Sequence, residues 1–545
     1  MTKKIDKTNT SKEPWLPLII ILMVQIQMAF NVNALPISMG PITNDLRTSA
    51  TSVGTALVIY SLFVAAFVLV GAKIGKKYGD RLVFQITTVI HGFSMTLMAL
   101  SQNALIMYIA QALAGLAAAA LVPTLVVLIA ANYRTPKQQA KALGALAGAP
   151  ALSGAMAFLI GGFLGTFATW RITFILLTVL SIVAFILSFR LKDIPAEKKT
   201  EIDTVGAVLA AISIILISFG ANNLNTWGVF LAKDAAPFNF FGLSPAIFMI
   251  IFGFLLGQFF FVWVRLKEKA GESGLFNLNV FQSQKELSSI ISLMFISAIG
   301  PAVNFLIPLY LQIVQNQTTL QTAVAVIPYT LAIATASLMV VSLMSHYSPR
   351  VIATAAFIII AVGLTTLSFT ISFSWGTPMV IFGLLLVGFA EGSLITLLFN
   401  VLVSDVPKHL AGDVGAVRGV ANNLSTALGT ALAGVISVSL LSAMVISSLM
   451  RSTVPNQLDQ YINFDNISFV SNDQLYSRLS QLDLTEEEID EAVQININAR
   501  QRSLRASFFL LAGFSLLAIV PSRGLPGYDE EEPYVVPSPT SSDET

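Results

Sequence analysis

Long apolar stretches, separated by short polar or Pro- and Gly-rich segments, repeat along the whole chain. A helix needs about 20 apolar residues to cross the ~30 Å hydrocarbon core of a bilayer, and each stretch is close to that length. We therefore predict an all-α integral membrane protein. The fourteen predicted helices run near residues 15–37, 51–72, 82–101, 104–131, 140–168, 171–189, 204–222, 244–264, 287–312, 321–343, 351–372, 377–403, 415–447 and 505–522.

The composition agrees with this prediction and excludes several classes of protein. Of the 545 residues, 55% are hydrophobic and only 11% are charged, whereas a soluble globular protein has roughly 25% charged residues. The 31 basic and 30 acidic residues nearly cancel, so we expect no nucleic-acid partner. There is no cysteine and there are three scattered histidines, so we expect neither a metal nor another cofactor. No phosphate loop or nucleophile elbow indicates an enzyme.

The positions of Lys and Arg predict the orientation in the bilayer. When the N-terminus is placed in the cytoplasm, the inner segments hold 23 of the 31 basic residues, as the positive-inside rule requires. All five tryptophans also fall at predicted span ends, where indole rings prefer to lie. We therefore expect both termini in the cytoplasm and a multi-pass protein of the plasma (inner) membrane.

Few residues lie outside the predicted spans. Residues 1–14 form a short cytoplasmic segment, and residues 448–504 form one large external loop. In this loop Thr485 precedes Glu488 by three residues, which is the spacing of a helix capping box, so part of the loop should be helical. Residues 523–545 are rich in Pro, Ser and acidic side chains. This composition predicts a disordered acidic tail on the cytoplasmic side.

Two ionisable side chains, His91 and Glu391, lie near the middle of predicted spans. Placing a charged group at the centre of a membrane helix costs ~2.5–3.5 kcal/mol, so such residues are functional candidates. We expect His91 to be a packing residue whose hydrogen bonds are satisfied. For Glu391 we expect a function.

Neutral amides are more common within the spans. Gln27 and Asn31 are four residues apart and share one face of the first helix, while Gln111 and Asn304 lie in the fourth and ninth helices. An amide can hydrogen-bond a solute without the cost of desolvating a full charge. It can equally link two helices, an interaction worth ~1 kcal/mol or less. The sequence leaves both interpretations open.

Glycines and a proline occur at short intervals in the fifth predicted helix. Gly144 and Gly148 are four residues apart, as are Gly161 and Gly165, and this spacing lets helix backbones approach closely. Pro150 should bend the same helix. Tight packing that can rock suits a transporter, although ordinary membrane-helix packing uses the same spacing.

Short motifs occur at ordered places along the chain. They are Asn33–Pro36 at the end of the first helix, Ala72–Arg81 between the second and third, Leu113–Pro123 in the fourth, Gly161–Phe174 across the fifth and sixth, Asp203–Gly206 before the seventh, and Pro308–Gln312 with Gln321–Pro328 in the ninth and tenth. Each motif alone is weak. Their order and spacing together resemble the major facilitator superfamily, and specifically its fourteen-helix drug:proton antiporter branch.

This resemblance implies a major facilitator fold with helices arranged as six, two and six. The first six-helix bundle would occupy residues 15–200, two linker helices 201–270, and the second bundle 271–522. Helices 1, 4, 9 and 12 would line a central cavity. The residues that the resemblance places around that cavity, as candidates for substrate binding, are Gln27, Asn31, Gln111, Asn304 and Glu391.

The resemblance also implies which residues lie elsewhere. His91, on the third helix, would sit outside the cavity. The candidates for gating and close packing are Gly79, Arg81, Gly148, Pro150, Gly161 and Gly162.

The chain departs from the family pattern at the positions that carry charge. In an ungapped comparison, the family's first-helix aspartate falls on Gln27 and its fourth-helix arginine on Gln111. Amides cannot titrate, so Glu391 is the remaining candidate for carrying protons.

We expect a transporter that exports a small organic solute by alternating access, proton-coupled through atypical residues if it is coupled at all. The alternatives are a facilitator without ion coupling and a non-transporting membrane receptor or scaffold that retains the fold.

Overall fold

The computed structural model describes residues 13–527, apart from 134, 199, 273, 276–283, 372–376, 405–410, 450–471 and 482–484. Within this range the β pairing consists of two isolated bridges near Leu243, and the rest of the regular structure is helical. The expectation of a disordered tail falls almost wholly outside the described residues.

The first group of helices precedes a long paired hairpin. These helices alternate in direction and pack mainly on their neighbours, with α3 on α5, α4 on α5 and α8, and α1 on α6 and α8. Their bounds are α1 (Leu16–Ile37), α2 (Met39–Asp45), α3 (Ala50–Tyr78), α4 (Asp80–Ala99), α5 (Ala104–Asn132), α6 (Pro136–Met156), the π-helix η1 (Ala157–Gly161), α7 (Gly162–Phe167) and α8 (Trp170–Ser188).

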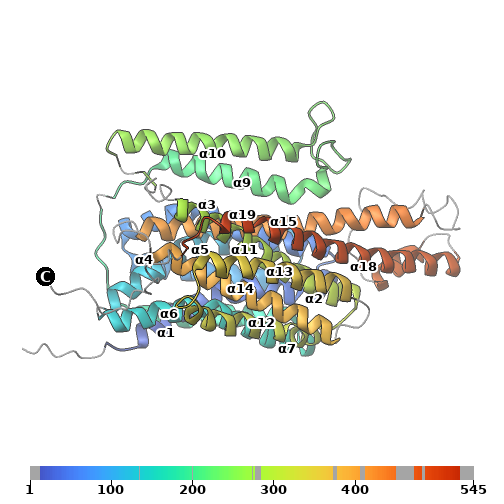
Figure 1. The fold of residues 1–545 in the computed structure, drawn as a ribbon, viewed down its shortest axis with the longest axis horizontal. Helices are drawn as coiled ribbons and strands as arrows, with labels where there is room; N and C mark the ends of the chain where they lie inside the picture. The colour runs from blue at the N-terminus through green and yellow to red at the C-terminus, as the bar shows by residue number, and fades with distance from the viewer. Residues whose placement is uncertain are drawn as a thin grey trace, which may run out of the picture.

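The hairpin consists of α9 (Thr204–Trp227) and α10 (Pro245–Lys269), which pack along each other. Gly220 and Gly253 make this contact close, because a Cβ at Gly220 would lie 2.8 Å from the carbonyl oxygen of Ala246. α9 also contacts α3 and α15, whereas much of α10 is exposed. The pair lies to one side of the other helices (Figure 1).

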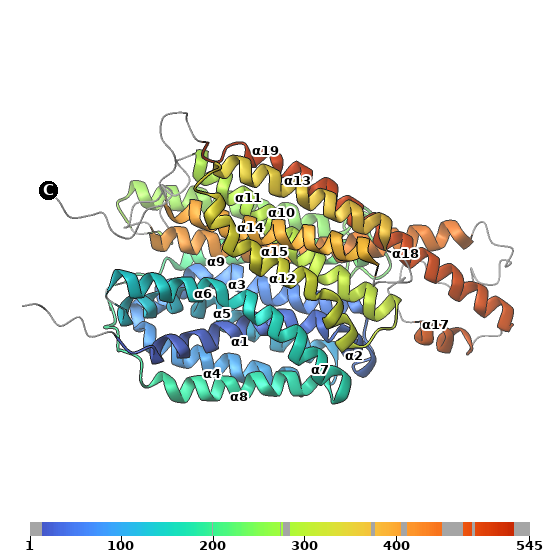
Figure 2. The same cartoon turned by 60° about the horizontal axis from the view of Figure 1, so that its bottom comes forward.

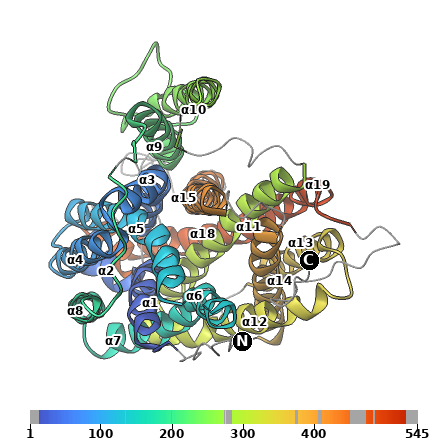
Figure 3. The ribbon, with the colours of Figure 1, turned by 90° about the vertical axis from the view of Figure 1, so that its left-hand side faces the viewer.

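The second group follows the hairpin. Its members are α11 (Gln284–Pro308), the π-helix η3 (Leu309–Val314), α12 (Thr319–Leu343), α13 (Pro349–Thr370), α14 (Pro378–Ser404), α15 (Ala411–Leu449), α17 (Asn472–Leu479), α18 (Glu486–Leu517) and α19 (Ile519–Ser522). α12 and α13 pack on α14, while α11 and α18 pack on α15. Viewed along the helices, the two groups lie side by side and the α9–α10 hairpin stands apart (Figure 3).

Fourteen helices among the described residues are long and apolar enough to cross a membrane. This agrees with the number predicted from the apolar stretches, and most helix ends lie within a few residues of the predicted ones. Large exposed side chains on these helices are mainly apolar, for example Phe93, Phe254 and Leu338, as expected for surfaces that face lipid.

The last helix differs from its prediction. α18 begins at Glu486, not near residue 505, and has 32 residues, which corresponds to about 48 Å. Thr485 and Glu488 form the predicted capping box, each side chain accepting from the other residue's backbone N–H. The first part of α18 therefore belongs to the predicted loop 448–504, which is helical over much of its described length. Its residues 450–471 lie outside the described part of the chain.

The two ends of the bundle are distinct. At the end where the described chain begins and stops, called here the terminal end, α1 starts and α19 finishes. At the opposite end, the extension end, α15 and α18 project beyond the other helices with α17 beside them (Figure 2). α15 alone has 39 residues, or about 58 Å, well above the thickness of a hydrocarbon core.

Candidate functional site

Two of the predicted cavity amides hydrogen-bond each other. Asn31 on α1 and Gln111 on α5 are both fully buried. Asn31 Nδ2 donates to Gln111 Oε1 at 2.9 Å, and Gln111 Nε2 donates to Asn31 Oδ1 at 3.1 Å. This reciprocal pair has the geometry of a link between two helices. A role in solute binding stays a prediction.

A second polar pair joins α1 to α4. Gln27 Nε2 lies 2.8 Å from His91 Nδ1, and both side chains are at most 1% exposed. The remaining polar atoms, Gln27 Oε1 and His91 Nε2, have no hydrogen-bond partner within the described part of the chain. That His91 lies outside the cavity stays a prediction, and on α4 its ring faces Gln27. Its hydrogen bonds are also only half satisfied.

Glu391 lies at the junction of three helices in the second group. Tyr329 Oη on α12 donates a hydrogen bond to Glu391 Oε2 on α14 at 2.5 Å. Glu391 Oε1 lies so close to Gly300 on α11 that a Cβ there would overlap it. Glu391 is 6% exposed and Tyr329 is fully buried. A buried carboxylate thus has one hydroxyl donor, and a glycine makes room for it.

Asn304 lies near this junction. It follows Gly300 by four residues and therefore shares its face of α11, and it is half-buried. The five predicted cavity residues consequently fall into two clusters, one among α1, α4 and α5 and the other among α11, α12 and α14. No hydrogen bond between described residues joins the two clusters.

Tyr329 was not predicted from the sequence. A tyrosine in an apolar stretch is usually a packing residue, because its ring is apolar, and only the position of its hydroxyl shows otherwise. Its location directly after Pro328, in the middle of a span, was the one available signal.

The two groups of helices are joined at the extension end by Gln312. This side chain, in η3 of the second group, is 4% exposed. Its Oε1 accepts from the backbone N–H of Gly40 at 2.6 Å, and its Nε2 donates to the carbonyl oxygens of Pro36 at 3.2 Å and Ile37 at 2.9 Å. One amide therefore satisfies three backbone groups where α1 ends and α2 begins.

A second contact at the same end joins α7 to the start of α12. Thr319 Oγ1 donates to the carbonyl oxygen of Gly162 at 2.9 Å, and the backbone N–H of Leu320 donates to Thr166 Oγ1 at 3.0 Å. A Cβ at Gly162 would lie 2.7 Å from Ala323 Cβ, and one at Gly165 would lie 2.8 Å from Thr319 Oγ1. Glycine thus permits the close approach here.

The other predicted packing positions behave differently. A Cβ at Gly144 or Gly148 would meet nothing within 4 Å, so the close approach expected there is absent. α6 continues through Pro150 as far as Met156. The irregularity comes later, as the π-helix η1, where a Cβ at Gly161 would lie 3.2 Å from Ile37.

Gly79 and Arg81 lie at the turn between α3 and α4. Gly79 has φ +93°, a backbone conformation that favours glycine. Arg81 Nη2 donates to the carbonyl oxygen of Phe189 at 2.9 Å, which ties this turn to the end of α8. A gating role for either residue stays a prediction.

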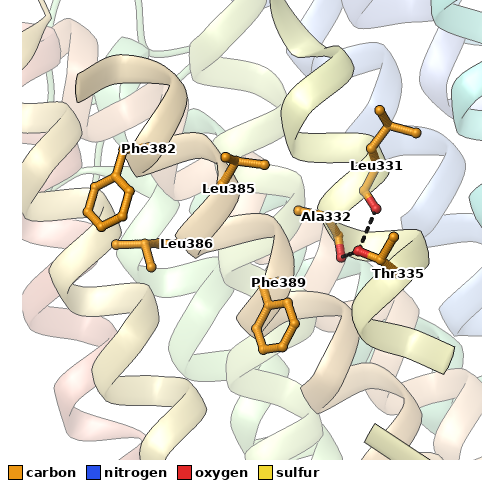
Figure 4. Close-up of a pocket in the computed structure, with 7 residues that line it drawn as sticks. All are labelled: Leu331, Ala332, Thr335, Phe382, Leu385, Leu386 and Phe389. Carbon is orange, nitrogen blue, oxygen red and sulfur yellow. Dashed lines mark hydrogen bonds between the residues drawn. The ribbon is translucent and has the colours of Figure 1, made fainter. Parts of the chain in front are cut away.

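A pocket of about 410 Å³ lies on the outer surface between α12 and α14. It is lined by Leu331, Ala332, Thr335, Phe382, Leu385, Leu386 and Phe389 (Figure 4). Its single hydroxyl, on Thr335, already donates to the carbonyl oxygens of Leu331 and Ala332. Because Leu331 and Phe382 are at least half exposed, we interpret the pocket as a lipid-facing groove and not as a solute site.

These features define a class of protein. Two groups of apolar helices pack on each other through α3 and α15 and are joined by hydrogen bonds at the extension end. Each group holds buried polar side chains between its own helices, as in proteins that carry solutes across bilayers by rocking. The family model of the Major Facilitator Superfamily matches residues 21–430, and the chain belongs to this superfamily. It is thus a multi-pass membrane transporter and not an enzyme.

Proteins of similar sequence are drug-resistance and efflux proteins. The puromycin resistance protein pur8 of Streptomyces alboniger is 24% identical over 435 residues, covering 78% of this chain and 82% of its own. The multidrug efflux pump LfrA of Mycolicibacterium smegmatis is 24% identical over 434 residues, covering 79% of this chain and 82% of its own. With the fourteen candidate spans, these relatives agree with the fourteen-helix branch that the motifs resemble.

Solved structures show the same fold. A bacterial homologue of the human lysosomal transporter Spinster, in an inward-facing and occupied conformation, has a TM-score of 0.61 and 12% identity, covering 93% of this chain and 95% of that chain. The POT family transporter PepTSo has a TM-score of 0.56 and 13% identity, covering 92% of this chain and 96% of that chain. At these identities the likeness concerns the fold alone.

Proposed function

We propose that this transporter exports small organic solutes of the kind that its relatives' names indicate, and that protons move inward in exchange. The observation that carries the proposal is the Glu391 carboxylate, buried in mid-span against Tyr329 and Gly300. The membership of the superfamily and the efflux relatives supply the context.

The terminal end is proposed to face the cytoplasm of a cell whose plasma (inner) membrane holds the protein. The excess of Lys and Arg in segments at that end supports this orientation. The hydrogen bonds between the two groups of described helices, through Gln312 and Thr319, lie at the extension end. In this orientation the structure is closed toward the outside.

Alternating access is proposed to arise from rocking of the two helix groups, which we take as the bundles 15–200 and 271–522. Opening the extension end requires the Gln312 and Thr319 contacts to break, while the apolar packing of α3 on α15 can act as the axis. The transported solute then meets Asn304 and Glu391 from one group and the α1 and α5 amides from the other.

Glu391 is proposed to be the proton carrier because a carboxyl group can gain and lose a proton. The side-chain amide of Asn304, in the same cluster, cannot. When ionised, Glu391 accepts the Tyr329 hydrogen bond. When protonated, it no longer carries a buried charge, which lowers the cost of moving its helices past one another. Release of the proton toward the cytoplasm and binding of solute would then alternate.

The test uses the purified chain in vesicles with an imposed pH gradient. We expect wild-type export of a panel of charged and neutral drugs to depend on the gradient. Glu391→Gln should abolish that dependence, since the amide cannot titrate, and Glu286→Gln should not. Glu286 suits as a control because it is likewise about nine-tenths buried in the second group, on α11.

Two outcomes would contradict the proposal in different ways. Equal export and equal pH dependence in Glu391→Gln and wild type would remove the proton-carrying role. Binding of solutes without any translocation by wild type would instead favour a receptor that retains the fold.

A further inference from the structure

A half-buried guanidinium at the terminal end has no neutralising partner among the described residues. Arg418 is half-buried on α15, and its Cζ lies 4.0 Å from the centroid of the Phe399 ring on α14. Within the described part of the chain, no carboxylate, carbonyl or amide contacts its five N–H donors. The cation–π contact covers one face of the planar group and leaves its edge free.

The other described arginines that are buried or half-buried differ in this respect. Arg171 donates to Asp45 and to the carbonyl oxygens of Ala99 and Ser101. Three others donate to backbone carbonyl oxygens, and these are Arg81, Arg500 and Arg505. An arginine within a span that lacks such a partner bears an uncompensated charge, which is costly in a membrane.

Arg418 lies where the two helix groups meet. The next residue, Gly419, contacts Val68 of α3, since a Cβ there would be 3.3 Å from the valine side chain. From Val68 to its end at Tyr78, α3 carries three lysines and no acid. Asp203, before α9, already accepts from the Trp263 indole at 3.0 Å and from the N–H of Gly206 at 3.0 Å. Lys76 forms an ion pair with Glu197, so Lys73 and Lys77 contribute the basic charge at this end of α3, which favours anions.

We propose that Arg418 and Phe399 form a subsite that binds the anionic group of an amphiphilic organic solute entering from the terminal end. The guanidinium edge would take a carboxylate or sulfonate through two parallel hydrogen bonds, and Phe399 would contact the adjoining apolar part. The subsite makes Arg418 a specificity determinant that favours anionic or zwitterionic solutes over lipophilic cations. This inference rests on the proposed transport function, because it names the class of solute.

The test measures binding separately from transport. Purified full-length protein in nanodiscs of phosphatidylcholine is titrated with naphthalene sulfonate, which is anionic, and with naphthalene sulfonamide, which is neutral. Arg418→Gln should weaken sulfonate binding by about tenfold, the loss expected when a bidentate charged hydrogen bond is removed. Sulfonamide binding should stay unchanged. Arg523→Gln, which removes an exposed charge at the same end, should change neither.

Phe399→Leu provides a second variant that keeps the charge. It should weaken binding of both compounds by a similar factor, because both share the naphthalene ring. The subsite is overturned if Arg418→Gln weakens both compounds equally, which would indicate a structural role. It is also overturned if the sulfonate effect requires nanodiscs with anionic lipid, since the bound group would then be a lipid phosphate.

Failure of transport is a separate outcome. If sulfonate binding depends on Arg418 but wild-type vesicles translocate no solute, the subsite holds and the proposed function fails. If solutes are exported and Arg418→Gln alters neither sulfonate binding nor the preference between the two compounds, export stands and the subsite fails.

Discussion

At the residue scale, most of the buried polar side chains predicted as solute ligands have a partner inside the protein. Asn31 and Gln111 satisfy each other across α1 and α5, and Glu391 is held by Tyr329. A polar group in a membrane-spanning helix is more stable when it is paired than when it faces lipid or an empty space. The partners therefore fix how these helices are rotated, whatever further role they have.

The Asn31–Gln111 pair can be tested by a double-mutant cycle. Asn31→Leu and Gln111→Leu should each destabilise the protein because each leaves the other amide buried and unpaired. The double variant should lose less than the sum, with a coupling energy of about 1 kcal/mol. Unfolding in mixed detergent and lipid gives the free energies. Additive losses would show that the pair contributes no interaction of its own.

At the element scale, the extension end is closed by short irregular segments. The π-helix η3 carries Gln312, and the π-helix η1 leads into α7, which contacts the start of α12. π-Helices are rare and often occur at functional positions. The extra residue in a π-turn rotates the residues that follow it about the helix axis. Here η3 contains one contact between the two helix groups, and η1 directly precedes the other.

Replacing Gln312 by Leu should open the extension end. The change removes three hydrogen bonds that join η3 to the backbone of Gly40, Pro36 and Ile37. Since the chain contains no cysteine, a single Ser38→Cys at the buried start of α2 reports on access. We expect an impermeant maleimide to label it about tenfold faster in the Gln312→Leu background, a shift that corresponds to roughly 1.4 kcal/mol.

Gln315→Leu is the matched control for that experiment. Gln315 follows the same π-helix, but its Nε2 donates to Tyr310 of its own group. Its replacement should leave the labelling rate near that of the parent. If both variants increased the labelling rate equally, the effect of Gln312→Leu would come from a general loss of packing and not from opening of the extension end.

Two glycines of the continuous helical stretch from α6 to α7, Gly162 and Gly148, should differ in how substitution by Ala changes the stability of the protein. Gly162→Ala would place a methyl group 2.7 Å from Ala323, and overpacking of this kind costs about 1–3 kcal/mol. Gly148→Ala meets nothing within 4 Å and should be neutral or stabilise the helix by up to ~1 kcal/mol. Thermal unfolding of the two variants gives the comparison. Similar losses for both would contradict the packing that the structure shows.

At the scale of the whole molecule, the bundle has two chemically different ends. Basic residues concentrate in the segments of the terminal end, whereas α15, α17 and α18 extend past the opposite end. Such an extension can lie only in water, because the first turn of α18 begins with three glutamates. If the extension end lies outside the cell, every connecting segment at the terminal end lies in the cytoplasm.

Single cysteines test this orientation in intact cells. Ser480→Cys, exposed after α17, should react with an impermeant maleimide added outside. Lys198→Cys, exposed between α8 and α9, should react only after the cells are permeabilised. The opposite pattern would reverse the orientation and the proposed direction of transport.

The sequence alone determined the class of fold and most of the helix positions. Hydropathy over some 20 residues depends only on local composition, and a bilayer accepts little else than helices at such positions. The prediction of helix positions was wrong for the start of α18. The first half of this helix is polar and lies beyond the bilayer, so hydropathy does not detect it. The capping box at Thr485 was the available sign that the chain was helical there.

The tertiary structure decided which polar side chains meet. Spacing along α1 shows that Gln27 and Asn31 share a face, but not that one meets His91 and the other Gln111. The partner of each side chain depends on the rotation and packing of a second helix, which no local pattern contains. For the same reason Tyr329 beside Glu391, and Arg418 stacked on Phe399 without a counter-charge among the described residues, became visible only in the folded chain.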